Sequence, residues 1–238
     1  MATLKYRAEI DGLRGLAVVP VILFHAGIEM FSGGFVGVDV FFVISGYLIT
    51  TILIEDIENK RFSIVDFYER RARRILPALF FVMLCCIPFA WMWMLPDPLE
   101  NFGQSIVATT LFSNNILLFV TSGYWDLASE VKPLLHTWSL AVEEQFYVLF
   151  PIFLLLTWRF GKKRLFWIIV VLASISLALS EWGWRNLATA NFYLGPTRAW
   201  ELFAGSLTAF IVQKKRCKEE QYDFSCWFCS NHFCYFRV

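Results

Sequence analysis

Long apolar runs, separated by short clusters of basic residues, constrain this chain more than any other feature. Of its 238 residues, 58% are hydrophobic and only 17% are charged. A helix needs about 20 apolar residues to cross the hydrocarbon core of a bilayer. Six runs approach or reach that length: residues 13–30, 35–54, 75–95, 140–158, 165–180 and 198–213. The sequence therefore predicts an all-α, polytopic membrane helix bundle with about six transmembrane helices.

The positions of the basic residues predict how these helices are oriented. Cytoplasmic loops of membrane proteins carry an excess of lysine and arginine. With six spans, 17 of the 21 basic residues fall on one side of the membrane. Only Lys132, Arg185 and Arg198 fall on the other side, and Arg237 lies in the tail. This asymmetry predicts that both termini are cytoplasmic.

A seventh apolar stretch, residues 103–121, is predicted not to cross the membrane. It carries Gln104, Ser113, Asn114 and Asn115. If it crossed, the basic residues would divide 12 to 8 instead of 17 to 3. Irregular backbone at membrane depth needs protein or water around it. We therefore expect a re-entrant or surface-lying hairpin on the outer side.

Ionisable side chains inside spans cost free energy, so each is a candidate functional group. Arg14 and His25 are eleven residues apart. They should project from one helix face, with His25 about 16 Å deeper. A neutral histidine near mid-membrane can act as a general base or hold a proton in a relay. The alternatives are a histidine bonded to a carbonyl for packing and an arginine that snorkels to the cytoplasmic surface.

Acidic residues mark two further spans. Asp39 lies in the second span, where it is either a functional acid or a helix-start acid that accepts backbone N–H bonds. Glu143 and Glu144 enter the fourth span shortly after His136. Neighbours on a helix point about 100° apart. We therefore expect one of these glutamates to be buried and the other to lie near the interface.

Two other charged patterns predict local structure. Residues 62–74 are typical of an amphipathic helix in the cytoplasmic loop 55–74, because apolar residues recur at helical spacing. Glu201 lies three residues beyond Arg198, a spacing at which side chains on a helix surface pair. We expect a surface ion pair there.

Four segments resemble the acyltransferase-3 family of bacterial integral membrane acyltransferases, which includes O-antigen acetylases. The family's hallmark is a basic residue, ten intervening residues and a histidine in the first span. Arg14 and His25 match it. The resembling segments are residues 6–18, 35–47, 67–77 and 136–147. The resemblance runs from about residue 5 to residue 212.

The resemblance implies transfer of an acyl group, usually acetyl, from cytosolic acetyl-CoA to a hydroxyl of a cell-envelope polysaccharide or lipopolysaccharide O-antigen. It makes His25 the leading catalytic residue, assisted by Arg14 and Glu143. Asp39, with Glu143, would shape the acceptor side. Because His25 lies deep in its helix, either the pantetheine arm reaches inward or the acyl group is relayed. Direct transfer and a covalent acyl-histidine both stay open.

The resemblance also assigns partners. Arg71, Arg73 and Arg74 would meet the CoA phosphates through charge-assisted hydrogen bonds, while also serving as a positive-inside anchor. We expect no bound cofactor, with acetyl-CoA as a substrate. The other partners are a glycan acceptor and the lipid bilayer, and the net charge of +1 implies no nucleic acid. The location is the bacterial inner membrane, with a cytoplasmic N-terminus and no cleavable signal peptide.

The end of the chain departs from the family. Residues 1–216 are predicted to be an incomplete N-terminal part of the membrane domain, and residues 217–238 an atypical tail that suggests frameshift or truncation. The tail holds Cys217, Cys226, Cys229 and Cys234, but a zinc site would need a second ligand pair. We therefore expect no metal site.

Two alternative functions follow from the same residues. The first is an inactive truncated membrane fragment. The second is a proton-coupled transporter in which Arg14, His25, Asp39 and Glu143 line a path. Transporters often contain inverted repeats, and no internal repeat is visible in this sequence.

Overall fold

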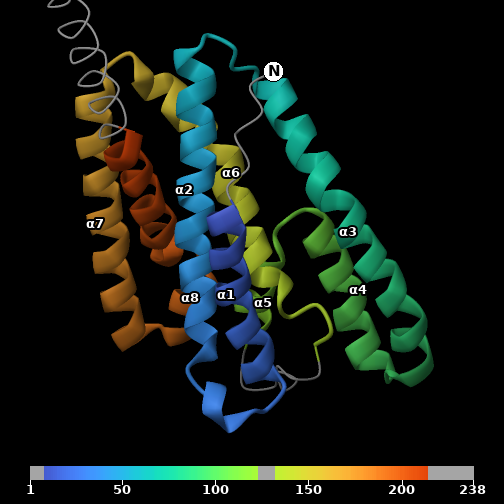
Figure 1. Ribbon diagram of the computed structural model, residues 1–238. Helices are drawn as coiled ribbons and strands as arrows, with labels where there is room; N and C mark the ends of the chain where they lie inside the picture. The colour runs from blue at the N-terminus through green and yellow to red at the C-terminus, as the bar shows by residue number, and fades with distance from the viewer. Residues whose placement is uncertain (1–7, 123–131, 214–238) are drawn as a thin grey trace, which may run out of the picture.

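A computed structural model describes residues 8–122 and 132–213, and every regular element within those residues is helical. The predicted all-α bundle is confirmed (Figure 1). The tail 217–238, with its four cysteines, lies outside the described residues. The helices are α1 (Ala8–His25), α2 (Gly37–Glu58), α3 (Ile64–Trp93), α4 (Pro96–Thr110), α5 (Asn114–Thr121), α6 (Thr137–Trp158), α7 (Lys162–Asn186), α8 (Ala188–Tyr193) and a last described helix, residues 195–213.

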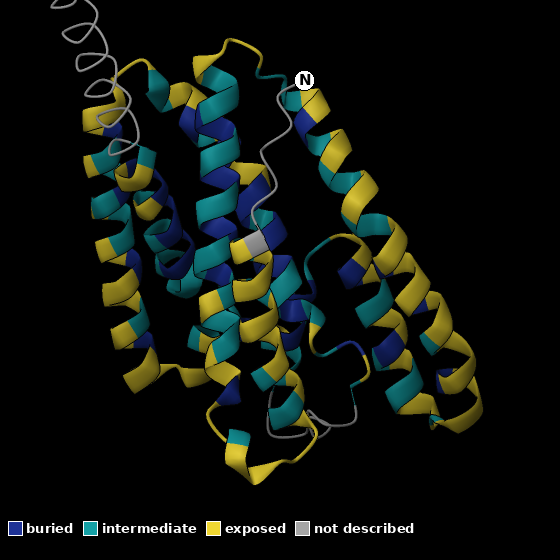
Figure 2. Ribbon diagram, viewed as in Figure 1, coloured by how far each residue is buried: buried dark blue, intermediate teal, exposed yellow. Residues whose placement is uncertain are grey.

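Four helices are long and apolar enough to cross a membrane: α2 with its preceding turn, α3, α6 and α7. About half of the most apolar stretch of α6 is buried, against 17% in α3 and α7. Thus α2 and α6 form the centre of the bundle, and α3 and α7 expose apolar side chains (Figure 2). The predicted span 198–213 is helical and the predicted span 13–30 is helical only as far as His25, and neither is among these four.

The predicted amphipathic helix 62–74 and the predicted span 75–95 form one continuous helix, α3. Ser63 caps it, because its Oγ accepts a hydrogen bond from the Asp66 N–H at 3.3 Å. The helix passes through Pro77 without ending. Its 30 residues extend about 45 Å, which exceeds the hydrocarbon thickness. The first turns of α3 can therefore hold charged side chains beyond the apolar core.

The stretch 103–121 is broken, as expected of a hairpin. The chain turns at 111–113, between α4 and α5, where Phe112 has a φ of 51°. The neighbouring Asn114 and Asn115 are buried within the protein. Asn114 donates to the Leu134 carbonyl at 3.0 Å, and Asn115 donates to the Tyr193 carbonyl at 3.1 Å. These polar residues anchor the irregular backbone to the rest of the bundle.

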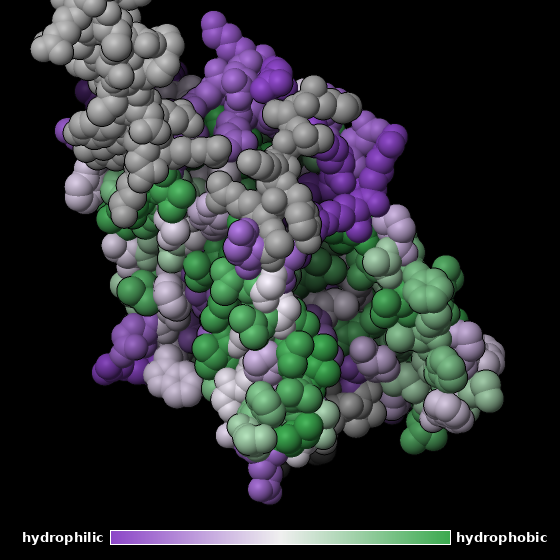
Figure 3. All heavy atoms as spheres, viewed as in Figure 1, coloured by the Kyte–Doolittle hydropathy of each residue, from purple (hydrophilic) through white to green (hydrophobic). Residues whose placement is uncertain are grey.

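Two of the predicted cytoplasmic segments meet the end of the last described helix at one end of the bundle, here called the basic end. Lys162 at the start of α7 forms an ion pair with Glu58 at the end of α2. Gln213 also donates to Glu58, at 3.2 Å. Arg70 on α3 lies 3.4 Å from Asp56. Figure 3 shows a strongly hydrophilic surface here, beside the start of α3. These contacts agree with the arrangement in which 103–121 does not cross.

The orientation of the basic end is a prediction that labelling can check. We expect a cysteine at Ser122, which ends α5, to react with a membrane-impermeant maleimide added from outside. A cysteine at Ser63, at the basic end, should react only after the membrane is permeabilised, because basic loops stay in the cytoplasm. The native cysteines are first replaced by serine. The reverse pattern of labelling would contradict the orientation.

Close backbone contact joins α2 to the last described helix. A Cβ on Gly46 would lie 2.0 Å from the Leu202 carbonyl oxygen, and one on Gly205 would lie 2.0 Å from the Val43 carbonyl oxygen. Nearby, the Thr50 hydroxyl donates to Ser206 Oγ at 2.8 Å. Small residues let two backbones approach in this way. This contact sets the position of the last helix against α2.

Candidate active site

The charged residues of the central helices line two separate cavities. The first, here called the basic-end cavity, has a volume of about 450 Å³. Its polar and aromatic lining consists of Asp11, Arg14, Phe41, Ser45, Tyr47, Thr51, Arg71, Arg74, Glu143 and Tyr147. The second, here called the histidine cavity, has a volume of about 580 Å³. Its polar and aromatic lining consists of Phe24, His25, Phe35, Asp39, His136, Trp138, Ser139, Phe192 and Arg198.

Arg14 and His25 share α1 but line different cavities. The Arg14 guanidinium lies 5.2 Å from the centre of the Phe41 ring, in the basic-end cavity. Eleven residues of helix separate the two by about 16 Å along the axis. Arg14 therefore cannot touch a group that His25 touches, unless that group is long enough to span both cavities.

The three arginines predicted to bind CoA have different surroundings. Arg71 and Arg74 line the basic-end cavity. The Arg71 guanidinium packs over the Tyr147 ring, 3.6 Å from its centre, and its buried Nε has no hydrogen-bond partner. Arg73 is 80% exposed and pairs with Glu69 at 2.5 Å. The structure thus separates the cluster into two residues that face the cavity and one that does not.

Glu143 and Glu144 are both buried, so the expectation that one would lie near the interface is wrong. The Tyr147 hydroxyl donates to Glu143. One carboxylate oxygen of Glu144 is buried without a partner. Both side chains are buried because α6 is central and other helices cover it on several sides. Glu143 lines the basic-end cavity and not the cavity that holds His25.

His25 lies at the last residue of α1, not near the middle of a membrane span. The helix ends there because the chain turns at Gly27, which has a φ of 77°. His25 Nδ1 lies 2.8 Å from the Val21 carbonyl oxygen, which can only accept a hydrogen bond. This contact assigns the proton to Nδ1 and leaves the lone pair on Nε2. An exposed imidazole in this tautomer can accept a proton in the cavity.

His136 contacts His25, although the two are far apart in sequence. Their ring centres lie 4.4 Å apart in an edge-to-face arrangement. Burial and the charge of His25 both lower the pKa of His136 from its usual value. His136 therefore stays neutral at neutral pH. The sequence placed His136 beside the glutamates, but the structure places it beside the other histidine.

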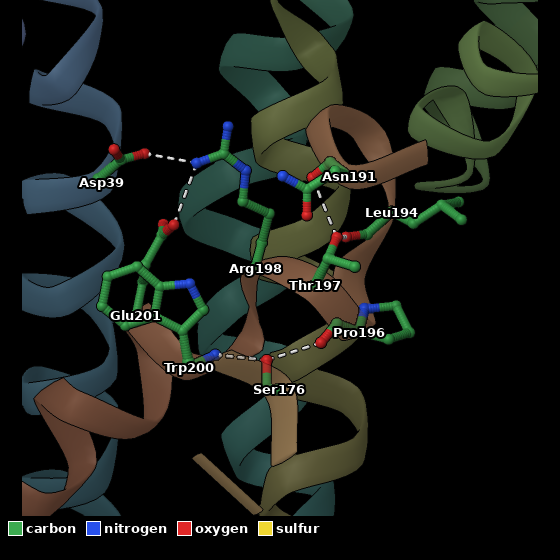
Figure 4. Close-up of polar contacts among 9 residues, drawn as sticks. All are labelled: Asp39, Ser176, Asn191, Leu194, Pro196, Thr197, Arg198, Trp200 and Glu201. Carbon is green, nitrogen blue, oxygen red and sulfur yellow. Dashed lines mark hydrogen bonds and ion pairs between the residues drawn. The ribbon is translucent and has the colours of Figure 1, made fainter. Parts of the chain in front are cut away.

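Asp39, Arg198 and Glu201 form a charged trio beside the histidine cavity, which Asp39 and Arg198 line. Arg198 Nη1 donates to Asp39 Oδ1 at 2.8 Å and to Glu201 Oε1 at 3.0 Å (Figure 4). Glu201 is 1% exposed, so the expected surface ion pair is a buried one. Asp39 lies in the first turn of α2, where its carboxylate binds Arg198. The i, i+3 spacing predicted the pair, but nothing in the sequence predicted that Asp39 would join it.

The four residues proposed for a proton path are divided between the cavities. Arg14 and Glu143 line the basic-end cavity, whereas His25 and Asp39 line the histidine cavity. Neither of these two cavities contains all four. The arrangement instead resembles two binding sites on opposite halves of the same bundle.

A helical membrane bundle with a basic cavity and a histidine cavity fits the class of integral membrane acyltransferases. The sequence profile of an acyltransferase domain, the acyltransferase-3 type, matches residues 7–228. The chain therefore belongs to this family, and it is a multi-pass membrane protein.

Two bacterial O-acetyltransferases are similar to this chain in sequence. The chain is 38% identical over 218 residues to the peptidoglycan O-acetyltransferase OatA of Listeria monocytogenes, covering 87% of this chain and 34% of the relative. It is 33% identical over 219 residues to the O-acetyltransferase OatA of Staphylococcus aureus, covering 87% and 35%. The chain thus spans about a third of the length of these relatives. No solved structure matches it.

Proposed function

We propose that this chain transfers an acyl group, in the first instance acetyl, to a hydroxyl of a cell-envelope glycan. The observation that carries the proposal is His25, whose Nδ1 is bonded to the Val21 carbonyl and whose Nε2 is free in an open cavity. The names of the relatives support O-acetylation, and one of them names peptidoglycan. We therefore favour a peptidoglycan-type acceptor over a lipopolysaccharide.

The basic-end cavity is proposed to bind the acyl donor, acetyl-CoA. Arg14, Arg71 and Arg74 line it, and it lies at the end that the positive-inside pattern places in the cytoplasm. Arginine is suited to phosphate because its guanidinium forms paired, charge-assisted hydrogen bonds. The donor is a substrate here and not a resident cofactor.

The acyl group must then travel along α1 to His25. The two cavities approach each other on α6, where the sequence neighbours Ser139 and Leu140 line different cavities. The acyl group passes this level of α6 in either route, whether the pantetheine arm carries it directly or it is relayed. We propose that transfer takes place on the His25 side.

His25 is proposed to act as the general base. In direct transfer, Nε2 removes the proton of the acceptor hydroxyl while the hydroxyl oxygen attacks the acyl carbonyl. The carbon–sulfur bond then breaks, and the CoA thiolate leaves and takes up that proton from the imidazolium. The new ester and free CoA are the products. His136, in contact with His25, is placed to steady the imidazole during this exchange.

A transfer assay in proteoliposomes tests the proposal. The purified chain is reconstituted, radiolabelled acetyl-CoA is added at the basic end, and soluble peptidoglycan glycan strands are added at the other end. We expect base-labile label on the strands, which mass spectrometry would locate as an acetyl ester. A correctly inserted chain that leaves the strands unlabelled would contradict the proposed function.

The arginines provide a matched test of the donor site. Arg74→Gln should weaken acetyl-CoA binding about tenfold, because a charge-assisted hydrogen bond to phosphate is lost. Arg73→Gln removes the same charge from the next residue, but Arg73 faces away from the cavity and pairs with Glu69. The affinity of Arg73→Gln for acetyl-CoA should stay within about twofold of that of wild type. Equal effects of the two changes would show that the cluster acts only through its overall charge.

A further inference from the structure

We propose that Arg198 is the specificity residue for the acceptor, and that it holds an uncharged sugar ring beside His25. The inference rests on the proposed function for the identity of the reaction. It adds a binding role for Arg198, Trp138 and Phe192, which lie together on one side of the histidine cavity.

Two carboxylates fix the direction of the Arg198 guanidinium. Both accept from the same nitrogen, Nη1: Asp39 Oδ1 on α2 at 2.8 Å and Glu201 Oε1 at 3.0 Å. Figure 4 shows the second terminal nitrogen pointing away from both carboxylates. Because one nitrogen takes both ion pairs, the other keeps its N–H groups for a ligand. Asp39, with a 32% exposed side chain, likewise keeps Oδ2 as an acceptor.

The helix that carries Arg198 is itself fixed at its first turn. The Ser176 hydroxyl on α7 donates to the Pro196 carbonyl at 2.6 Å and accepts from the backbone N–H of Trp200 at 2.9 Å. The Thr197 hydroxyl bonds the Leu194 carbonyl at 2.9 Å. Figure 4 shows the Ser176 bonds below Arg198 and the Thr197 bond to its right. The guanidinium is therefore positioned before any ligand arrives, which lowers the entropy cost of binding.

The charges of the trio favour a neutral ligand. Two carboxyl groups surround one guanidinium, so the trio has no surplus positive charge with which to hold a phosphate or a carboxylate. What it offers is an N–H donor beside a carboxylate acceptor. Neighbouring hydroxyl or amide groups of a sugar match such a pair, since each can donate one hydrogen bond and accept another.

Aromatic side chains complete the site. The Arg198 guanidinium lies 5.7 Å from the centre of the Trp138 ring and 5.4 Å from that of Phe192. The two rings are themselves 4.6 Å apart. Small-ligand sites are typically apolar and aromatic with a few placed polar groups. The C–H face of a sugar ring can pack on Phe192, which is exposed and backed by the buried Trp138, while its hydroxyls reach Arg198 and Asp39. This leaves another hydroxyl for His25.

Binding of chitotetraose, an uncharged oligosaccharide of N-acetylglucosamine, tests this role without turnover. Arg198→Gln should weaken its binding to the detergent-solubilised chain about tenfold or more, because a hydrogen bond from a charged donor is lost. Affinity for acetyl-CoA should not change, because Arg198 lies outside the basic-end cavity. The control is Arg185→Gln, which breaks an exposed arginine–glutamate pair on α7 and should change neither affinity.

A second variant tests the same role if Arg198→Gln fails to fold. Arg198→Lys keeps a charge for the two carboxylates but loses the fork that supplies the second donor. We expect it to fold and still to bind chitotetraose about tenfold more weakly. Wild-type affinity in Arg198→Lys, or in a folded Arg198→Gln, would overturn the proposal. So would a wild-type protein that does not bind chitotetraose at all.

A charged probe separates this site from a general saccharide surface. A uronate-containing tetrasaccharide should bind the wild-type chain at least about tenfold more weakly than chitotetraose. Asp39→Asn removes one negative charge, so it should reduce this difference in affinity. Equal binding of the two probes by the wild-type chain would overturn the preference for a neutral ring. If chitotetraose binds as expected but no acetyl transfer occurs, the subsite stands and the proposed function fails.

Discussion

Replacing His25 with glutamine is expected to reduce acyl transfer by about 10²–10⁴-fold, the usual cost of losing a general base. Glutamine can keep a side-chain bond to the Val21 carbonyl, which His25 Nδ1 makes at 2.8 Å. It cannot accept and return a proton as Nε2 does. The change therefore separates the chemical role from the packing role. Transfer to glycan strands and the amount of inserted protein are measured together.

The pH dependence gives the same test a second readout. A general base acts only in its unprotonated form, so transfer should fall as the pH falls. The pKa of His136 is lowered from its usual value, so His136 stays neutral to a lower pH than a free histidine. We expect full activity above neutrality and loss on the acid side.

Two results would contradict the assignment of His25. One is a correctly inserted His25→Gln chain that transfers acetyl within a few-fold of wild type. The other is a His25→Gln chain whose residual transfer rate falls with decreasing pH in the same way as that of wild type. Either result would leave His25 as a histidine that packs at the end of α1.

Gly46→Ala is expected to destabilise the fold by about 3 kcal/mol or more, at the upper end of overpacking costs. The added Cβ would lie 2.0 Å from the Leu202 carbonyl oxygen and 2.8 Å from its carbon. Both are backbone atoms, which cannot move aside as a flexible side chain can. The helix carrying Arg198 would therefore have to move away from α2. Thermal aggregation of the detergent-solubilised chain measures the loss.

Gly103→Ala is the matched control for Gly46→Ala. Gly103 is also inside a helix, α4, but its added Cβ would meet nothing within 4 Å. Alanine is the better helix former by about 1 kcal/mol, so this change should leave the stability unchanged or raise it. If Gly46→Ala were as stable as Gly103→Ala, the close contact between α2 and the last described helix would be wrong.

Sequence patterns alone were enough to predict the fold class, the family and most of the helices. Apolar runs near the length of a membrane span have few stable conformations other than a helix, because lipid leaves backbone groups no partner outside their own segment. The polar residues of 103–121 likewise indicated a break, since Asn114 and Asn115 need protein partners. The sequence was less informative about where helices end. It predicted two elements in place of α3, because the residues change there from charged to apolar.

The contacts between charged residues of different helices became known only from the packed bundle. His25 and His136 are 111 positions apart, and Asp39 and Arg198 are 159 apart. Helical spacing relates residues within one helix, but it contains no information about how one helix is rotated or shifted against another. That packing depends on close contacts such as Gly46 against Leu202. It therefore separates Glu143 from His25, and it brings Arg198 to the histidine cavity.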